Sequence, residues 1–137
     1  MREIDTIILH CTATPAGREV TIEEVDRWHR ERGFRCVGYH FLVLLDGSVQ
    51  TGRQLSEVGA HCRNHNLRSV GIAYVGGLTT DGKPADTRTK EQRKVLRALV
   101  EYVQDIVYRQ QGTIPRVVTH HMLDHSKACP CFTLEEL

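Results

Sequence analysis

The chain has 137 residues, a formal net charge of +1 at pH 7, eight histidines and five cysteines. This length predicts one domain with a stable core, spanning residues 1–137. The balanced, scattered charge argues against binding to nucleic acid or to a membrane surface, and no apolar run approaches the roughly 20 residues of a membrane span. We expect a monomer.

The cysteines and the start of the chain indicate where the protein is made. Five cysteines cannot all pair within one chain, so a complete set of internal disulfides is excluded. Residues 1–5 lack the long apolar segment of a secretory signal. We therefore expect synthesis in a reducing compartment, while a processed or separately exported form stays open.

Apolar runs and capping signals predict alternating strands and helices. Thr21 with Glu24, and Thr89 with Gln92, have the spacing of capping boxes and begin the two helices. Asp46-Gly47 is a strong hairpin signal between two strands. The expected elements are strands at 4–11, 39–45, 48–51, 70–75 and 116–119, and helices from about 22 to 33 and from about 90 to 111.

The order strand–helix–hairpin–strand–helix–strand predicts the fold class. It favours an α/β domain in which a mixed central β-sheet is flanked by helices. Residues 55–69 lack a clear period and predict a short helical turn followed by a loop. Residues 80–86 predict a solvated loop.

Histidines follow apolar strands at both ends of the chain. His10 ends the first strand, and the pair His120-His121 ends the last one, with Cys129 and Cys131 shortly after. Imidazole and thiolate are typical zinc ligands, and a His, His, Cys set leaves one position open, as in catalytic zinc sites. The residues thus predict a catalytic zinc centre.

Plainer interpretations exist for the same residues. A single strand-end histidine is usually a hydrogen-bonded surface residue, and Cys129-Pro-Cys131 would suit a redox or structural pair. However, one intervening residue fits the usual Cys-x-x-Cys spacing poorly. We therefore expect one of these two cysteines to be a ligand and the other a buried filler. The remaining cysteines, at 11, 36 and 62, are expected to act as small hydrophobic residues.

Several short motifs carry a resemblance to one family and recur in the same order. They are Ile8–Thr14, Trp28-His29, Val37–Phe41, Asp46-Gly47, Gly52-Arg53, Val58–His61, Asn66 with Ser69–Gly71, Val75–Gly77 and Lys127–Pro130. Together they resemble the zinc-dependent N-acetylmuramoyl-L-alanine amidases of phage-lysozyme type, to which the animal peptidoglycan recognition proteins are related. The resemblance spans nearly the whole chain.

The resemblance implies an activity and a set of site residues. The activity is hydrolysis of the amide between N-acetylmuramic acid and the L-alanine of the stem peptide in peptidoglycan. The family's ligands for one zinc ion fall on His10, His120 and Cys129, and its catalytic residues on Tyr39 and Lys127. Tyr39 would orient the attacking water or move its proton, and Lys127 would stabilise the charge on the carbonyl oxygen.

Two further expectations concern the histidines and the cleft. His61 and Asn66 are expected at the rim, in contact with sugar or peptide, whereas His40 is expected to be buried. The family's ligand histidine usually lies eight residues before the cysteine, which would select His121. We favour His120 because Thr119–Leu123 matches the family's strand-end pattern, and because neighbours on a strand face opposite sides.

Three functions stay open on these residues. The main expectation is a cell-wall lytic amidase, made in the bacterial cytoplasm and acting on the wall after release. A cytoplasmic amidase that recycles released muropeptides would use the same bond and the same metal. A module that binds peptidoglycan without cutting it is disfavoured because Cys129, Lys127 and Tyr39 are all present.

Overall fold

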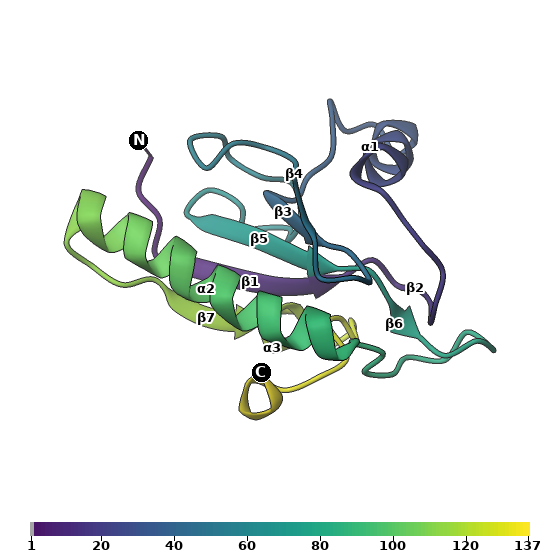
Figure 1. Ribbon diagram of the computed structural model, residues 1–137. Helices are drawn as coiled ribbons and strands as arrows, with labels where there is room; N and C mark the ends of the chain where they lie inside the picture. Colours follow the sequence, from purple (N-terminus) through teal and green to yellow (C-terminus); the bar gives the residue numbers. More distant parts are fainter. Residues whose placement is uncertain (1) are drawn as a thin grey trace.

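A five-stranded mixed sheet forms the centre of the computed structural model, which describes residues 2–137 (Figure 1). Its strand order is β4-β3-β5-β1-β7, and every neighbouring pair is parallel except β3 and β4. The strands are β1 (Thr6–Cys11), β3 (Phe41–Val43), β4 (Val49–Thr51), β5 (Ser69–Tyr74) and β7 (Arg116–Thr119). A separate small sheet pairs β2 (Thr14–Pro15) with β6 (Gly77–Leu78).

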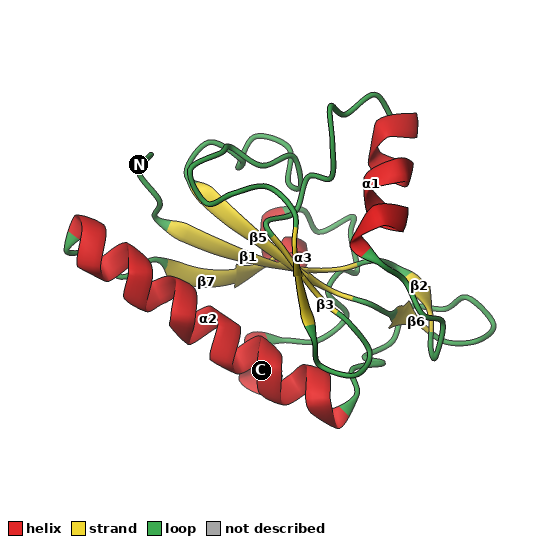
Figure 2. Cartoon of the chain, turned by 45° about the horizontal axis from the view of Figure 1, so that its top comes forward, coloured by secondary structure: helices red, strands yellow, loops and turns green. Residues whose placement is uncertain are grey.

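Helices α1 and α2 cover opposite faces of this sheet (Figure 2). The helical elements are α1 (Ile22–Glu31), α2 (Lys90–Gln111), α3 (His120–Leu123) and a 3-10 turn at Leu134–Glu136. Thr89 and Gln92 form a complete capping box on α2, as predicted. Thr21 caps α1, but the Glu24 side chain pairs with Arg18, so the second predicted capping box is only half formed. α2 ends at Gly112, whose φ of 77° is the left-handed conformation that glycine adopts at little cost. The predicted α/β fold class, a mixed sheet flanked by helices, is confirmed.

Alternation along β1 decides which side chains reach which face. Ile7, Leu9 and Cys11 pack into the large core beneath α2. Ile8 packs with Val118 on the other side of the sheet. Because side chains on a strand alternate, His10 shares the face of Ile8. The strand therefore places its terminal histidine on the face opposite α2.

Some predicted elements differ from the structure. The strand expected at 39–45 extends only over β3, so Tyr39 and His40 lie in the segment before it. This segment is held by side-chain bonds, because buried Arg53 donates to the carbonyls of Val37 and Val58 at 2.9 Å each. His40 is fully buried, as expected.

The loop regions also depart from expectation. Residues 55–68 contain turns and no helix, so the predicted helical turn is wrong. Three hydrogen-bonded turns are present there, in which Glu57 N–H donates to Gln54 O at 2.9 Å, His65 N–H to Cys62 O at 2.9 Å and Ser69 N–H to Asn66 O at 3.4 Å. The small β2–β6 sheet was not predicted, because two-residue strands carry no period. Among residues 2–137, no helix has both the length and the apolar composition needed to cross a membrane.

Two buried histidines make the stability of the fold depend on pH. Nδ1 of His29 accepts from Gly38 N–H at 2.8 Å, and Nδ1 of His40 accepts from Gly71 N–H at 3.0 Å. Burial is the main cause that lowers the pKa of each imidazole to about 4. The unfolded chain, with a His pKa of about 6.5, then binds more protons than the folded chain between pH 4 and 6.5.

We therefore expect the metal-free protein to be less stable at pH 5 than at pH 7. The stabilising contribution is present above the unfolded pKa and is lost as pH falls, by roughly 1–2 kcal/mol per histidine. Urea unfolding with a chelator present measures this. His29→Phe should reduce the pH dependence, whereas a control variant of an exposed histidine, His65→Phe, should retain it. An unfolding free energy that is equal at pH 5 and pH 7 would contradict the prediction.

Candidate functional site

Three potential metal ligands from the two ends of the chain meet where β1 and β7 end. His10 ends β1, His120 begins α3, and Cys129 lies in the segment that follows. One ligand atom of each lies within 4.8 Å of the other two, and Cys129 Sγ lies 3.9 Å from His10 Nδ1. His10 is buried, and the other two side chains are half-buried. The group is therefore partly accessible to solvent.

The sheet explains why His10 and His120 are neighbours. β1 and β7 are parallel, with Leu9 opposite Thr119, so the residues that follow each strand leave the same edge of the sheet. The ring centroids of His10 and His120 lie 4.7 Å apart. Parallel pairing of the first and last strands thus brings together residues that are far apart in the sequence.

The side chains of His120 and His121 point in different directions because α3 begins at His120. The hydroxyl of Thr119 accepts from Met122 N–H at 3.2 Å, so α3 begins at His120. Consecutive helical residues are rotated by about 100°, and this turns His121 away from the site. His121 is exposed, and its Nδ1 lies 2.7 Å from Lys127 O. The expected cause, alternation along a strand, is therefore wrong, because both residues are helical.

Hydrogen bonds hold Cys129 against β1 and β5. Cys11 N–H donates to Cys129 Sγ at 3.0 Å, and the buried Tyr74 hydroxyl donates to Pro130 O at 2.7 Å. The Cys131 thiol instead donates to Gly77 O at 3.3 Å. The two sulfurs therefore have different surroundings, and only Cys129 belongs to the histidine group.

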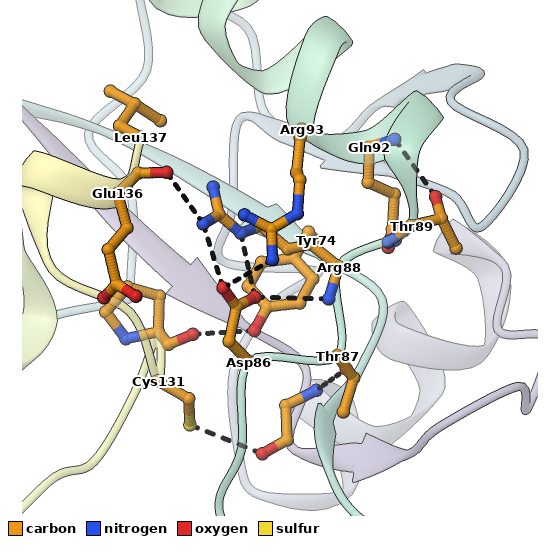
Figure 3. A network of polar contacts seen from close by, with 12 residues as sticks. Tyr74, Asp86, Thr87, Arg88, Thr89, Gln92, Arg93, Cys131, Glu136 and Leu137 are labelled. Carbon is orange, nitrogen blue, oxygen red and sulfur yellow. Dashed lines mark hydrogen bonds and ion pairs between the residues drawn. The ribbon is translucent and has the colours of Figure 1, made fainter.

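The segment after Cys129 is anchored by a buried arginine (Figure 3). Arg88 pairs with Asp86 at 2.9 Å, donates to Glu136 O at 3.1 Å, and its guanidinium lies 3.5 Å from the ring centroid of Phe132. Arg93 adds a second ion pair to Asp86 at 3.0 Å. Sequence reasoning missed this anchor, because Asp86 was expected in a solvated loop and nothing in the sequence marks Arg88 as buried.

Of the two predicted catalytic residues, Tyr39 has its ring beside His10, and Lys127 contacts the histidine pair through its backbone. The ring of Tyr39 is 5.3 Å from that of His10, and burial is the main cause that raises the pKa of its phenol. Lys127 is exposed, and its backbone N–H closes a turn onto Asp124 O at 3.0 Å. The pKa of His120 is lowered mainly by burial; Asp124 opposes this shift, and Lys127 adds to it. Lys127 is tied to the histidine pair through its backbone, because its carbonyl oxygen lies 2.7 Å from His121 Nδ1.

His61 and Asn66 are engaged within the protein. His61 is half-buried, and its Nδ1 lies 2.8 Å from His10 Nε2. The side-chain oxygen of Asn66 accepts from the N–H groups of His61 and Cys62 at 2.9 Å each. Asn66 thus fixes the loop that carries His61. Their contact with sugar or peptide stays a prediction, and the link between His61 and His10 was not predicted.

The sequence and the fold have counterparts in known proteins. A family model described as N-acetylmuramoyl-L-alanine amidase matches residues 1–132. An endolysin of Enterobacteria phage K11 is 36% identical over 136 residues, which cover 98% of this chain and 85% of the relative. A peptidoglycan-recognition protein of Drosophila melanogaster is 29% identical over 135 residues, 95% of this chain and 70% of that protein.

A solved structure agrees with these sequence matches. The N-acetylmuramoyl-L-alanine amidase LysC from Clostridium intestinale URNW superposes with a TM-score of 0.78 at 26% identity. The match covers 96% of this chain and 79% of LysC. From the family match over nearly its whole length, the chain belongs to the N-acetylmuramoyl-L-alanine amidases, enzymes that hydrolyse an amide bond of peptidoglycan.

Proposed function

We propose that this amidase holds one zinc ion between His10, His120 and Cys129 and uses it to cleave the bond between N-acetylmuramic acid and L-alanine. The observation that carries the proposal is the convergence of these three side chains, with ligand atoms within 4.8 Å of one another. Two imidazoles and a thiolate suit zinc, and three protein ligands leave a position for water.

The charge states of the donors support a metal. Burial is the main cause that lowers the pKa of His10 well below its usual value, and it also lowers that of His120. Both imidazoles are therefore neutral at pH 7, which is the form that binds metal ions. The N–H of Cys11, 3.0 Å from Cys129 Sγ, would stabilise a thiolate. When bound, zinc would polarise the scissile carbonyl and lower the pKa of a water molecule towards about 7.

Tyr39 and Lys127 supply the other groups for hydrolysis. Because burial raises its pKa, the Tyr39 phenol keeps its proton near neutral pH and acts as a hydrogen-bond partner that orients the attacking water. Lys127 carries an exposed ammonium group on the segment between His120 and Cys129. As the amide is attacked, negative charge develops on the carbonyl oxygen, and this ammonium stabilises it more in the transition state than in the substrate.

The substrate we propose is the stem peptide while it is still attached to the glycan. A relative over 98% of this chain is named an endolysin, which favours action on the cell wall after release from the cytoplasm where the enzyme is made. Retention of Cys129 argues against a module that binds peptidoglycan without cutting it.

Digestion of purified cell walls tests the activity and the bond. We expect free peptides that begin with L-alanine, intact glycan strands, loss of activity with a chelator and recovery with zinc. Mass spectrometry of the products and assay of new amino termini provide the measurement. New reducing ends without new alanine termini would mean a glycosidase. Cleavage of soluble muropeptides alone, with intact walls untouched, would instead favour recycling.

Ligand identity is tested with the two neighbouring histidines. His120→Ala should lose bound zinc and activity, because it removes one of three ligands. The matched variant His121→Ala should keep its zinc, since His121 points out of the site. Zinc content per chain is measured by elemental analysis after gel filtration. The reverse pattern would show that the spacing to Cys129 determines the ligand.

Removal of the catalytic groups should separate catalysis from binding. In Lys127→Ala and Tyr39→Phe the three ligands remain, so zinc content and wall binding should stay near those of the unmodified protein. Turnover should fall by roughly 10² or more, the scale found when one group that stabilises a developing oxyanion is lost. Unchanged turnover in Lys127→Ala would reduce that residue to a surface charge.

A further inference from the structure

Nε2 of His10 is part of a partly buried chain of hydrogen bonds. Nδ1 of His10 faces Cys129 Sγ at 3.9 Å, whereas Nε2 lies 2.8 Å from His61 Nδ1. A ring nitrogen that binds a metal carries no hydrogen, so the hydrogen of a neutral His10 resides on Nε2. Nε2–H then donates to His61 Nδ1.

The direction of this bond determines the next ones. His61 accepts at Nδ1, so a neutral His61 carries its hydrogen on Nε2, which lies 3.4 Å from Ser69 Oγ. The hydroxyl of Ser69 donates to His65 O at 2.6 Å, and Ser69 is 1% exposed. Each donor therefore meets an acceptor, and the chain ends at a backbone carbonyl that cannot give up a hydrogen. One tautomer of His10 satisfies all three bonds.

Two glycines make room for the ring of His61. A Cβ atom added at Gly59 would lie 2.6 Å from His61 Cδ2, and one added at Gly71 would lie 2.6 Å from the same atom. Real side chains do not tolerate such distances, so only glycine fits at these two positions while His61 stays in place. Asn66 Oδ1 also accepts from His61 N–H at 2.9 Å, which holds the backbone that carries this ring.

We propose that His61 is a positioning residue that holds His10 in the tautomer whose Nδ1 faces the metal, with Ser69 fixing the tautomer of His61 in turn. The inference rests on the proposed zinc site and deepens it. Metal-binding histidines commonly donate their other N–H to a fixed partner, and loss of that partner typically weakens metal binding by about 10–100-fold. This role differs from a contact with sugar or peptide, which would change substrate binding and leave zinc affinity unaltered.

Zinc affinity, measured by competition with a chromophoric chelator, tests the proposal without any substrate. His61→Phe keeps a ring of similar shape but offers no acceptor, so we expect affinity to fall by about 10–100-fold. His61→Asn should lie closer to the unmodified protein, because its side-chain oxygen can accept near the position of Nδ1. Ser69→Ala should give a smaller loss than His61→Phe. His125→Phe, the same substitution at an exposed histidine, is the control and should leave affinity unchanged.

A spectroscopic readout checks the tautomer itself. In the zinc-loaded protein, nitrogen-15 NMR of the His10 ring should show a hydrogen on Nε2. In His61→Phe the visible spectrum of the cobalt-substituted protein should change, because the ring of His10 is no longer held. Hydrogen on Nδ1 of His10 in the zinc-loaded protein would overturn the proposal.

The other possible results of the affinity measurements also support or overturn the positioning role of His61. Unchanged zinc affinity in a folded His61→Phe would overturn the positioning role while leaving the proposed function intact. If circular dichroism shows that His61→Phe does not fold, His61→Asn is compared with His61→Ala, and equal affinities of these two variants would overturn the role. An unmodified protein that binds no zinc would overturn the proposed function and this inference with it.

Discussion

Parallel pairing of β1 with β7 is the constraint on which the rest of the site depends. It places β1, an interior strand, beside β7 at the edge of the sheet, and the residues that follow both strands leave the sheet at the same ends of the strands. This pairing brings His10 close to His120, with ring centroids 4.7 Å apart. Other elements then determine which side chains join the group. α3 selects one of two adjacent histidines, and Tyr74 and Arg88 hold the segment after Cys129 against the core.

Residues of β5 support the site although they supply none of its candidate ligands. β5 contributes no potential ligand to the group, yet its small residue Gly71 leaves space for the ring of His61. Its hydroxyl residues, Ser69 and Tyr74, donate to the carbonyls of His65 and Pro130, at the two opposite ends of the strand. β5 thus supports His10 through His61 at one end and the Cys129 segment at the other. Ser69, Gly71 and Tyr74 thus have structural roles on a strand that supplies none of the candidate ligands.

Local signals in the sequence predicted local structure well. The capping residues Thr21 and Thr89 begin helices, and the strand expected at 116–119 has those bounds in the structure, because each depends on a few neighbouring residues. We predicted that His10 lies beside a histidine of the 120–121 pair because each follows an apolar strand. The bond from His10 to His61 crosses 51 positions and leaves no pattern in one sequence. The four residues of α3 are too few to show a helical period, so the faces of His120 and His121 were predicted for the wrong physical reason.

The distance along the chain between the candidate ligands has a consequence for synthesis. His10 and Cys129 are 119 positions apart, and two of the three ligands follow residue 115. A chain that is still being translated therefore exposes its first strand, one of the central strands of the final sheet, long before β7 exists to cover one of its edges. Contacts of such long range form late, because a large loop must close before they stabilise anything. A truncated product that ends before β7 would carry only one of the three candidate ligands, so the group cannot form until the residues after β7 have been made.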